Sequence, residues 1–196
     1  MNKMKMWIVA GVFGLIVVIL GASTIGTYNS LASAENSVDK AWSDVETTYQ
    51  RRADLIPNLV AVAEQASIRE EGILESVIQA RADAVNAPSD DINAVENTQG
   101  ELTNALSRLM VVSEDYPELQ SNQNWIDLQA QIEGTENRIN TARRDYNEIA
   151  QSYNDKLVRF PTNTFAGIFG FEKAEFFKSD PGSANAPTIT FDNEDG

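Results

Sequence analysis

The chain has 196 residues, a formal net charge of −14, and neither cysteine nor histidine. The missing cysteines exclude disulfides, thiol catalysis and thiolate metal sites, and the missing histidines remove the usual residue of catalytic triads, zinc sites and pH switches. So acidic a surface argues against nucleic acid as a partner, because phosphate contacts need clustered Lys and Arg. We expect no enzymatic activity, no cofactor and no metal.

Residues 1–26 are predicted to form a membrane anchor. Residues 6–25 read MWIVAGVFGLIVVILGASTI and contain no charge. At ~1.5 Å per residue this run spans ~30 Å, the thickness of a hydrocarbon core. A cleaved signal peptide is the alternative, because Ala32-Ser33-Ala34 has a small-x-small form. That site lies beyond the apolar run and inside the helical repeat that follows it, so an uncleaved anchor is favoured.

The charges on either side of the apolar run predict its orientation. Lys3 and Lys5 precede the run, whereas Glu35 and Asp39 follow it. The positive-inside rule then places the N-terminus in the cytoplasm and the body of the protein outside it.

Residues 27–87 are predicted to form one long helix. Pro57 removes an amide donor and crowds the carbonyl of Ala53, so a kink is expected there. Apolar residues recur with the alternating spacing of three and four that is typical of a coiled-coil seam. One seam position holds Leu31, Val38, Val45, Leu59, Ala66 and Ile73, and the other holds Ala34, Ala41, Thr48, Leu55 and Val62.

Two further helices are predicted, over residues 91–114 and 122–160. Pro88-Ser89-Asp90-Asp91 supplies the break and a cap before the first of them, and Asp115-Tyr116-Pro117 is a stop signal after it. The last helix repeats Tyr146-Asn147 as Tyr153-Asn154 one heptad later. The fold class is therefore all-α: a transmembrane helix continuing into an antiparallel bundle of three long helices plus a short C-terminal helix, over residues 27–178.

A series of short motifs resembles the LemA family over residues 1 to about 178. Besides the membrane helix, the motifs are Tyr28-Asn29, Ala41-Trp42-Ser43, residues 51–60, Tyr116-Pro117, residues 135–139, Ala142-Arg143, the two Tyr-Asn pairs, Phe160-Pro161, Gly170-Phe171 and Phe176-Phe177. The resemblance implies a helical-bundle body on one helix in a bacterial plasma (inner) membrane, and it brings no catalytic residues. Members of the family are usually predicted to have the body in the cytoplasm, the reverse of what Lys3 and Lys5 indicate.

A buried arginine is predicted in the middle of the bundle. Arg52 falls on the seam, where a charge needs a carboxylate from another helix. The candidate interhelical polar network is Arg51, Arg52, Asp54, Glu136 and Arg143. The alternative is that Arg51, Arg52, Arg143 and Arg144 cradle an anionic ligand, as a ligand-sensing bundle would require.

The helix lengths predict an uncovered stripe near the membrane. A helix over residues 27–87 would run ~90 Å, against ~57 Å for the helix over residues 122–160. The stripe of Leu31, Val38, Trp42 and Val45 would then lack a partner in its own chain. Either the first helix breaks at Pro57 and folds back, or other copies of the chain cover the stripe and make it a self-association surface.

An aromatic cluster follows the last long helix. Phe165, Phe169, Phe171, Phe176 and Phe177 are a candidate contact patch for a neighbouring subunit or the bilayer interface. The alternative is a plug that caps an open end of the bundle. The acidic tail, residues 179–196, is expected to be flexible, with a small island of strand-forming residues at Thr188-Ile189-Thr190-Phe191.

These features together predict a membrane-anchored, non-enzymatic protein that assembles with copies of itself as a scaffold or organiser. The alternative is an adaptor that docks a membrane protease or another envelope partner through its acidic helical body.

Overall fold

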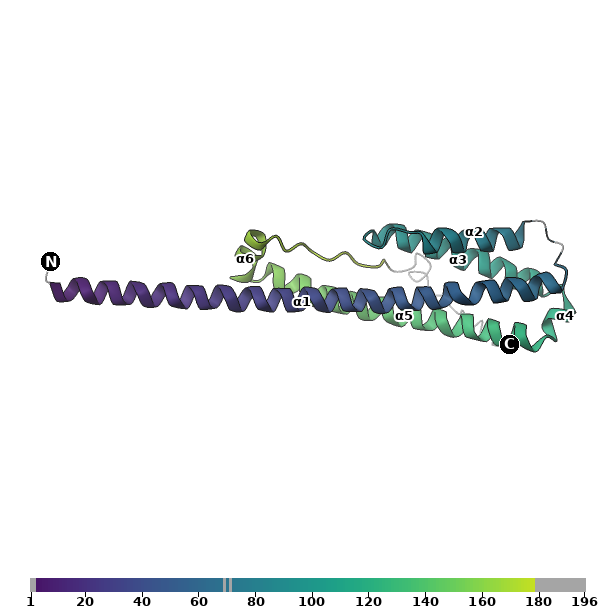
Figure 1. Ribbon diagram of the computed structural model, residues 1–196, viewed down its shortest axis with the longest axis horizontal. Helices are drawn as coiled ribbons and strands as arrows, with labels where there is room; N and C mark the ends of the chain where they lie inside the picture. The colour runs from purple at the N-terminus through teal and green to yellow at the C-terminus, as the bar shows by residue number, and fades with distance from the viewer. Residues whose placement is uncertain (1–2, 69, 71, 179–196) are drawn as a thin grey trace, which may run out of the picture.

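The computed structural model describes residues 3–68, 70 and 72–178, so the predicted tail lies outside the described residues. That part of the chain is all helical, as predicted (Figure 1). Its helices are α1 (Lys3–Gln65), α2 (Ile73–Val85), α3 (Ile92–Ser113), α4 (Pro117–Gln120), α5 (Gln123–Val158) and α6 (Thr162–Phe169).

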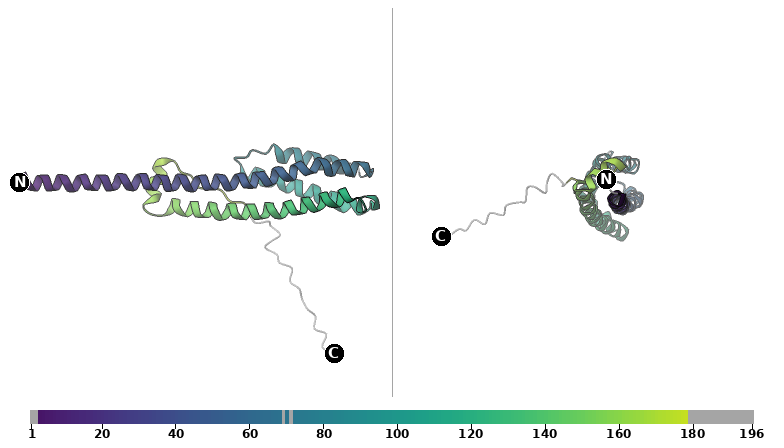
Figure 2. Two further views of the ribbon diagram at one scale, coloured as in Figure 1. Left: turned by 60° about the horizontal axis from the view of Figure 1, so that its bottom comes forward. Right: turned by 90° about the vertical axis from the view of Figure 1, so that its left-hand side faces the viewer.

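The two long helices, α1 and α5, pack antiparallel along the body (Figure 1). The hairpin of α2 and α3 covers only the half of this pair that is farther from the N-terminus, while α6 lies at the near end (Figures 1 and 2). The body is therefore a four-helix bundle at its far end and a helix pair at its near end.

The N-terminal part of α1 projects alone from the bundle (Figure 2). The side chains of residues 10–23 are all exposed, including Phe13, Leu15 and Val18 at 67%, 61% and 67%. This helix is long and apolar enough to cross a membrane. An apolar helical segment that packs against nothing in its own chain fits a membrane anchor. The α1 helix continues without interruption from this segment into the bundle.

The first predicted helix is shorter than its heptads indicate. The α1 helix passes through Pro57 but ends at Gln65, and the chain reverses before α2 begins at Ile73. Ser67 and Gly72 adopt positive φ angles of 54° and 81°, which a continuing helix cannot accommodate. The prediction of one helix over residues 27–87 is therefore wrong, and so is the placing of a break at Pro57.

The other two long helices begin where their caps predict. The carboxylate of Asp91 accepts a hydrogen bond from the amide of Ala94 at 3.0 Å, and α3 starts at the next residue. The side-chain oxygen of Asn122 accepts a hydrogen bond from the amide of Asn124 at 3.0 Å, and α5 starts at the residue after Asn122.

The body has two hydrophobic cores. The distal core lies between α1, α2, α3 and the start of α5, and is built from Ile56, Leu59, Val77, Leu102, Leu109, Trp125 and their neighbours. The proximal core lies between α1, α5, α6 and an extended segment, residues 171–178, which we call the strap. Residues of the proximal core include Leu31, Val38, Val45, Tyr146, Tyr153, Ala166 and Phe177.

The predicted bare stripe is covered within the chain. Leu31 and Val45 are fully buried, Val38 is buried and Trp42 is half-buried in the proximal core. Because α1 ends at Gln65, α5 is long enough to reach the membrane-proximal end, and the strap covers the side that α2 and α3 leave open (Figure 1). The stripe therefore does not stand free for self-association.

Candidate docking groove on helix α5

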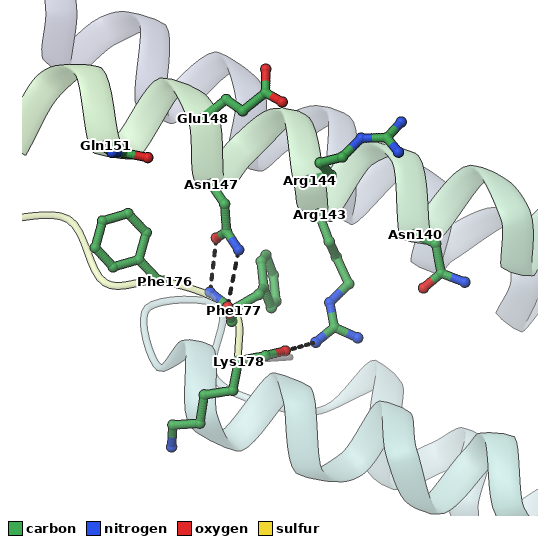
Figure 3. A pocket seen from close by; sticks show the side chains of 9 residues that line it. All are labelled: Asn140, Arg143, Arg144, Asn147, Glu148, Gln151, Phe176, Phe177 and Lys178. Atoms are coloured by element: carbon green, nitrogen blue, oxygen red, sulfur yellow. Dashed lines mark hydrogen bonds between the residues drawn. The ribbon is translucent and has the colours of Figure 1, made fainter. Parts of the chain in front are cut away.

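The strap is held along α5 by two asparagine side chains. The amide of Asn154 donates to the carbonyl of Ala174 and accepts from the amide of Ala174, both at 2.9 Å. Asn147 forms the same pair of bonds with Phe177, at 3.0 and 2.9 Å (Figure 3). Each asparagine thus binds the strap's backbone as a neighbouring strand would, and we call the two residues the clamps.

The spacing of the clamps matches the strap. Seven helical residues rise ~10.5 Å, and three extended residues span ~10 Å, so a heptad on α5 and a three-residue step on the strap stay in register. The repeated Tyr-Asn pairs in the sequence are the signal of this arrangement. Sequence reasoning noticed the repeat and missed what the asparagines bind.

Aromatic and cationic side chains secure the end of the strap. The Phe177 ring stacks on Trp42 with centroids 5.6 Å apart and meets Tyr146 edge-on at 5.4 Å. The Arg143 guanidinium lies 4.7 Å from the centroid of Phe177, a cation–π distance. The Tyr146 hydroxyl donates to the carbonyl of Glu175 at 3.1 Å, and burial raises the pKa of this phenol.

A groove of about 690 Å³ opens beside the strap on α5. Its walls carry the cations Arg143, Arg144 and Lys178, one carboxylate, Glu148, and the amides Asn140 and Gln151, so cations outnumber the single anion (Figure 3). Arg143 bonds the Glu96 carboxylate and the carbonyl of Lys178, the latter at 3.3 Å. Arg144 is exposed and forms no ion pair within the described part of the chain. Asn140 stands one heptad before Asn147, at the next position that could clamp an extended chain.

Arg52 is the centre of a buried polar network at mid-bundle. Its Nη1 atom bonds the Glu136 carboxylate and, at 3.0 Å, the Thr103 hydroxyl, while Nη2 bonds the side chain and, at 3.3 Å, the carbonyl of Gln99. Burial lowers the pKa of Arg52, and the adjacent Glu136 opposes that shift. The carboxylate predicted to come from another helix is therefore Glu136.

The structure brings together only part of the predicted network. Arg51 is exposed, and Asp54 accepts a hydrogen bond from Gln50 on its own helix at 2.7 Å. Arg143 forms a second ion pair, with Glu96 on α3, and this pair lines the same cavity as Arg52 and Glu136. Arg51 and Arg144 do not line this cavity, and Glu136 and Glu96 neutralise the two arginines that do, so the four arginines do not form an anion cradle.

The aromatic cluster is divided between the proximal core and the surface. Phe177, on the strap, is buried in the proximal core, and Phe165 and Phe171 are half-buried. Phe169 and Phe176 remain 40% and 44% exposed. The cluster thus closes the end of the bundle in part and leaves a remainder at the surface.

The sequence of the body matches the LemA family model over residues 41–191. The chain belongs to the LemA family. Two proteins named magnetosome protein MamQ 1 and MamQ 2, from Paramagnetospirillum magneticum, are each 30% identical to it over 200 residues, covering 90% of this chain and 73% of theirs. A protein named LemA from Metamycoplasma hominis is 25% identical over 142 residues, covering 72% of this chain and 64% of its own.

The LemA match includes every residue of the groove and the strap. It starts after the anchor and continues past Lys178 into the acidic tail. The similarity to the MamQ proteins covers 90% of this chain, and the N-terminal apolar helix fits a bacterial membrane anchor. Neither the family's description nor the names of these relatives give a catalytic activity.

Proposed function

We propose that this LemA-family protein is a membrane-anchored, non-enzymatic scaffold that assembles with copies of itself at the bacterial inner membrane. The observation that carries the proposal is the cationic groove on α5 in a chain whose net charge is −14. A rigid α1 helix joins the bilayer to the bundle, so a contact made at the groove is transmitted directly to the membrane.

The C-terminal tail supplies a segment of the right charge for the groove. Residues 179–196 contain Asp180, Asp192, Glu194 and Asp195 and no Lys or Arg. The clamps recognise backbone rather than side chains, and both already bind the strap. Asn140, one heptad before Asn147 in the groove, presents a third amide that could bind the backbone of the tail in the same way, whatever its sequence. In the proposed assembly, the tail of one copy occupies the groove of the next.

The size of the particle tests self-assembly. Full-length protein in detergent should elute in light-scattering chromatography at a mass several times that of one chain, and removal of residues 179–196 should reduce it to one chain. Arg144→Glu should have the same effect, because it opposes the acidic tail, whereas Arg138→Glu on another exposed part of α5 should leave the mass unchanged. A single-chain mass across a wide concentration range overturns the proposal.

A mixing experiment separates exchange between copies from docking within one copy. The tail-deleted chain keeps its groove, and the Arg144→Glu chain keeps its tail. If tails bind neighbouring copies, these two variants should form a mixed pair although neither assembles alone. If the tail binds its own groove, the mixture stays at single-chain mass.

The adaptor role is the second candidate, and the same groove favours it. A partner that presents an extended acidic segment could be clamped in place of the tail. Such an adaptor would stay small until an envelope partner is added, and a synthetic acidic peptide would bind the tail-deleted protein without changing its mass beyond the peptide's own.

We further propose that the body lies outside the cytoplasm, on the charges of Lys3 and Lys5. Val111 is 66% exposed on α3, and the natural chain has no cysteine, so a cysteine introduced there would be its single thiol. A Val111→Cys variant should react with a membrane-impermeant maleimide in cells whose inner membrane is intact but whose outer layers are permeable. Reaction only after lysis would place the body in the cytoplasm.

A further inference from the structure

Apolar side chains are exposed at the end of the bundle nearest the anchor. Val158 at the end of α5, Phe160 in the following turn, and Ile168 and Phe169 on α6 are exposed to 55%, 85%, 71% and 40%. We call residues 158–169 the foot. Elsewhere on the described helices of the body, the large exposed aliphatic residues are Ile78 and Val85 on α2, Val111 on α3 and Ile126 on α5, at most two on any one helix.

Aromatic contacts fix the foot beside the end of the membrane segment. The Tyr28 ring on α1 meets Phe169 edge-on with centroids 5.1 Å apart, and Phe171 at 5.7 Å. Tyr28 follows Ile25, the last residue of the apolar run, by three positions. At ~1.5 Å per residue this is ~4.5 Å along the helix axis, so Tyr28 and the foot lie at the depth of the lipid headgroups.

The charge of the foot also suits a membrane surface. The foot, residues 158–169, contains Arg159 and no Asp or Glu, in a chain of net charge −14. Lys156 lies just before it, and Asp155 and Glu172 flank the segment. Basic side chains near a bilayer attract anionic headgroups. Phe and Tyr rings partition favourably into the headgroup layer at the bilayer surface. The acidic remainder of the body would be repelled by the same surface.

We propose that the foot is a second membrane contact, with Phe160 and Ile168 inserted among the headgroups of the bilayer that α1 crosses. The anchor fixes the depth of the bundle, and the foot fixes its rotation and tilt about α1. Because α6 also packs on α1 and α5, the orientation set at the membrane is passed to the strap and the groove. This inference rests on α1 crossing the membrane and does not depend on self-assembly.

Site-directed labelling can measure the depth of the foot cleanly, because the chain has no native cysteine. Phe160→Cys and Ile168→Cys carry a nitroxide at the foot, and Val111→Cys carries it at an equally apolar, exposed position on α3. The full-length variants are placed, one copy per disc, in nanodiscs of phosphatidylethanolamine and phosphatidylglycerol. Collision of the label with oxygen and with a water-soluble nickel complex is then compared.

The foot labels should show a ratio of oxygen to nickel collisions several-fold above that of the Val111 label. A ratio at both foot positions equal to that of Val111 overturns the proposal. A raised ratio that appears only when several copies share a disc would assign the foot to contact between copies and also overturns it. Far-ultraviolet circular dichroism confirms that each variant is folded, and the particle mass reports on self-assembly independently.

Discussion

The Nε atom of Arg81 on α2 donates a hydrogen bond of 2.7 Å to the carbonyl oxygen of Ala53 on α1. Ala53 lies four residues before Pro57, which has no amide hydrogen to donate to it. The proline thus frees a carbonyl inside a helix, and an arginine from the returning helix binds it. The bond ties α2 to α1 at the place where α1 is locally weakened.

A double-mutant cycle tests this relationship. Arg81→Ala should destabilise the protein by ~1–3 kcal/mol, because it leaves a partly buried carbonyl without a donor. In a Pro57→Ala background the new amide at position 57 can bond Ala53, so the same change should cost less than ~0.5 kcal/mol. Arg108→Ala, an exposed arginine on α3, is the control and should have no measurable effect. Equal costs of Arg81→Ala in both backgrounds, in urea unfolding, would contradict the pairing.

Removal of Arg52 should be among the most destabilising single changes in the bundle. Its side chain is 2% exposed, and Arg52→Ala leaves Gln99 without its partner and opens a cavity in the core. Loss of one member of a fully buried ion pair costs ~3–5 kcal/mol, but the Glu136 side chain is 38% exposed and water can solvate the carboxylate left behind. We therefore expect a loss near ~3 kcal/mol, the lower end of that range. Arg52→Met fills the volume without burying a charge, and we expect thermal unfolding to show that it recovers most of the loss. A sensor role would require in addition that an added anion shifts the unfolding temperature of the wild-type protein and that the stable Arg52→Met variant loses this shift.

Hydrogen exchange of the strap's amides tests whether the clamps hold the strap on α5. Asn147→Ala and Asn154→Ala each remove two hydrogen bonds, worth ~0.5–1.5 kcal/mol apiece, and should release residues 174–177. Hydrogen exchange of the amides of Ala174 and Phe177 should accelerate by more than tenfold. Asn140→Ala is the matched control, since its amide bonds nothing within the described part of the chain. Unchanged protection of both amides would mean that aromatic packing alone holds the strap.

Two buried tyrosines predict alkaline destabilisation. Burial raises the pKa of Tyr49 to about 12, and burial together with the nearby Glu35 raises that of Tyr153 to about 12. A pKa raised in the folded state means that the folded protein holds its proton longer than the unfolded chain. The stability is therefore complete below pH ~10 and falls between pH ~10 and ~12, by up to ~1.4 kcal/mol per pH unit for each phenol.

Phenylalanine variants isolate these groups. Tyr49→Phe and Tyr153→Phe should each make the loss of stability above pH ~10 shallower. At pH 7, Tyr49→Phe should be neutral or stabilising, because its buried hydroxyl has no hydrogen-bond partner among the described residues. Tyr146→Phe, which loses a bond to the carbonyl of Glu175, should cost ~1 kcal/mol. Urea titrations at pH 7 and at pH ~11 give both comparisons.

The sequence by itself determined the helical class, the anchor and the faces of the long helices. Heptad positions such as Leu31, Val38 and Val45 are buried, as their spacing predicts, because a seam of apolar side chains must face a partner whatever that partner is. The caps at Asp91 and Asn122 start their helices for an equally local reason, since a side chain satisfies amides only a few residues away.

Only the tertiary structure decided which surfaces meet. The reversal at Ser67 and Gly72 shortens α1, and this single change brings α5 and the strap over the stripe that the sequence left bare. The pairing of Arg52 with Glu136, and the binding of Asn147 to Phe177, join residues tens of positions apart. Such contacts depend on how long each helix is and where the chain turns, so periodicity specifies that a residue is buried but not which partner covers it.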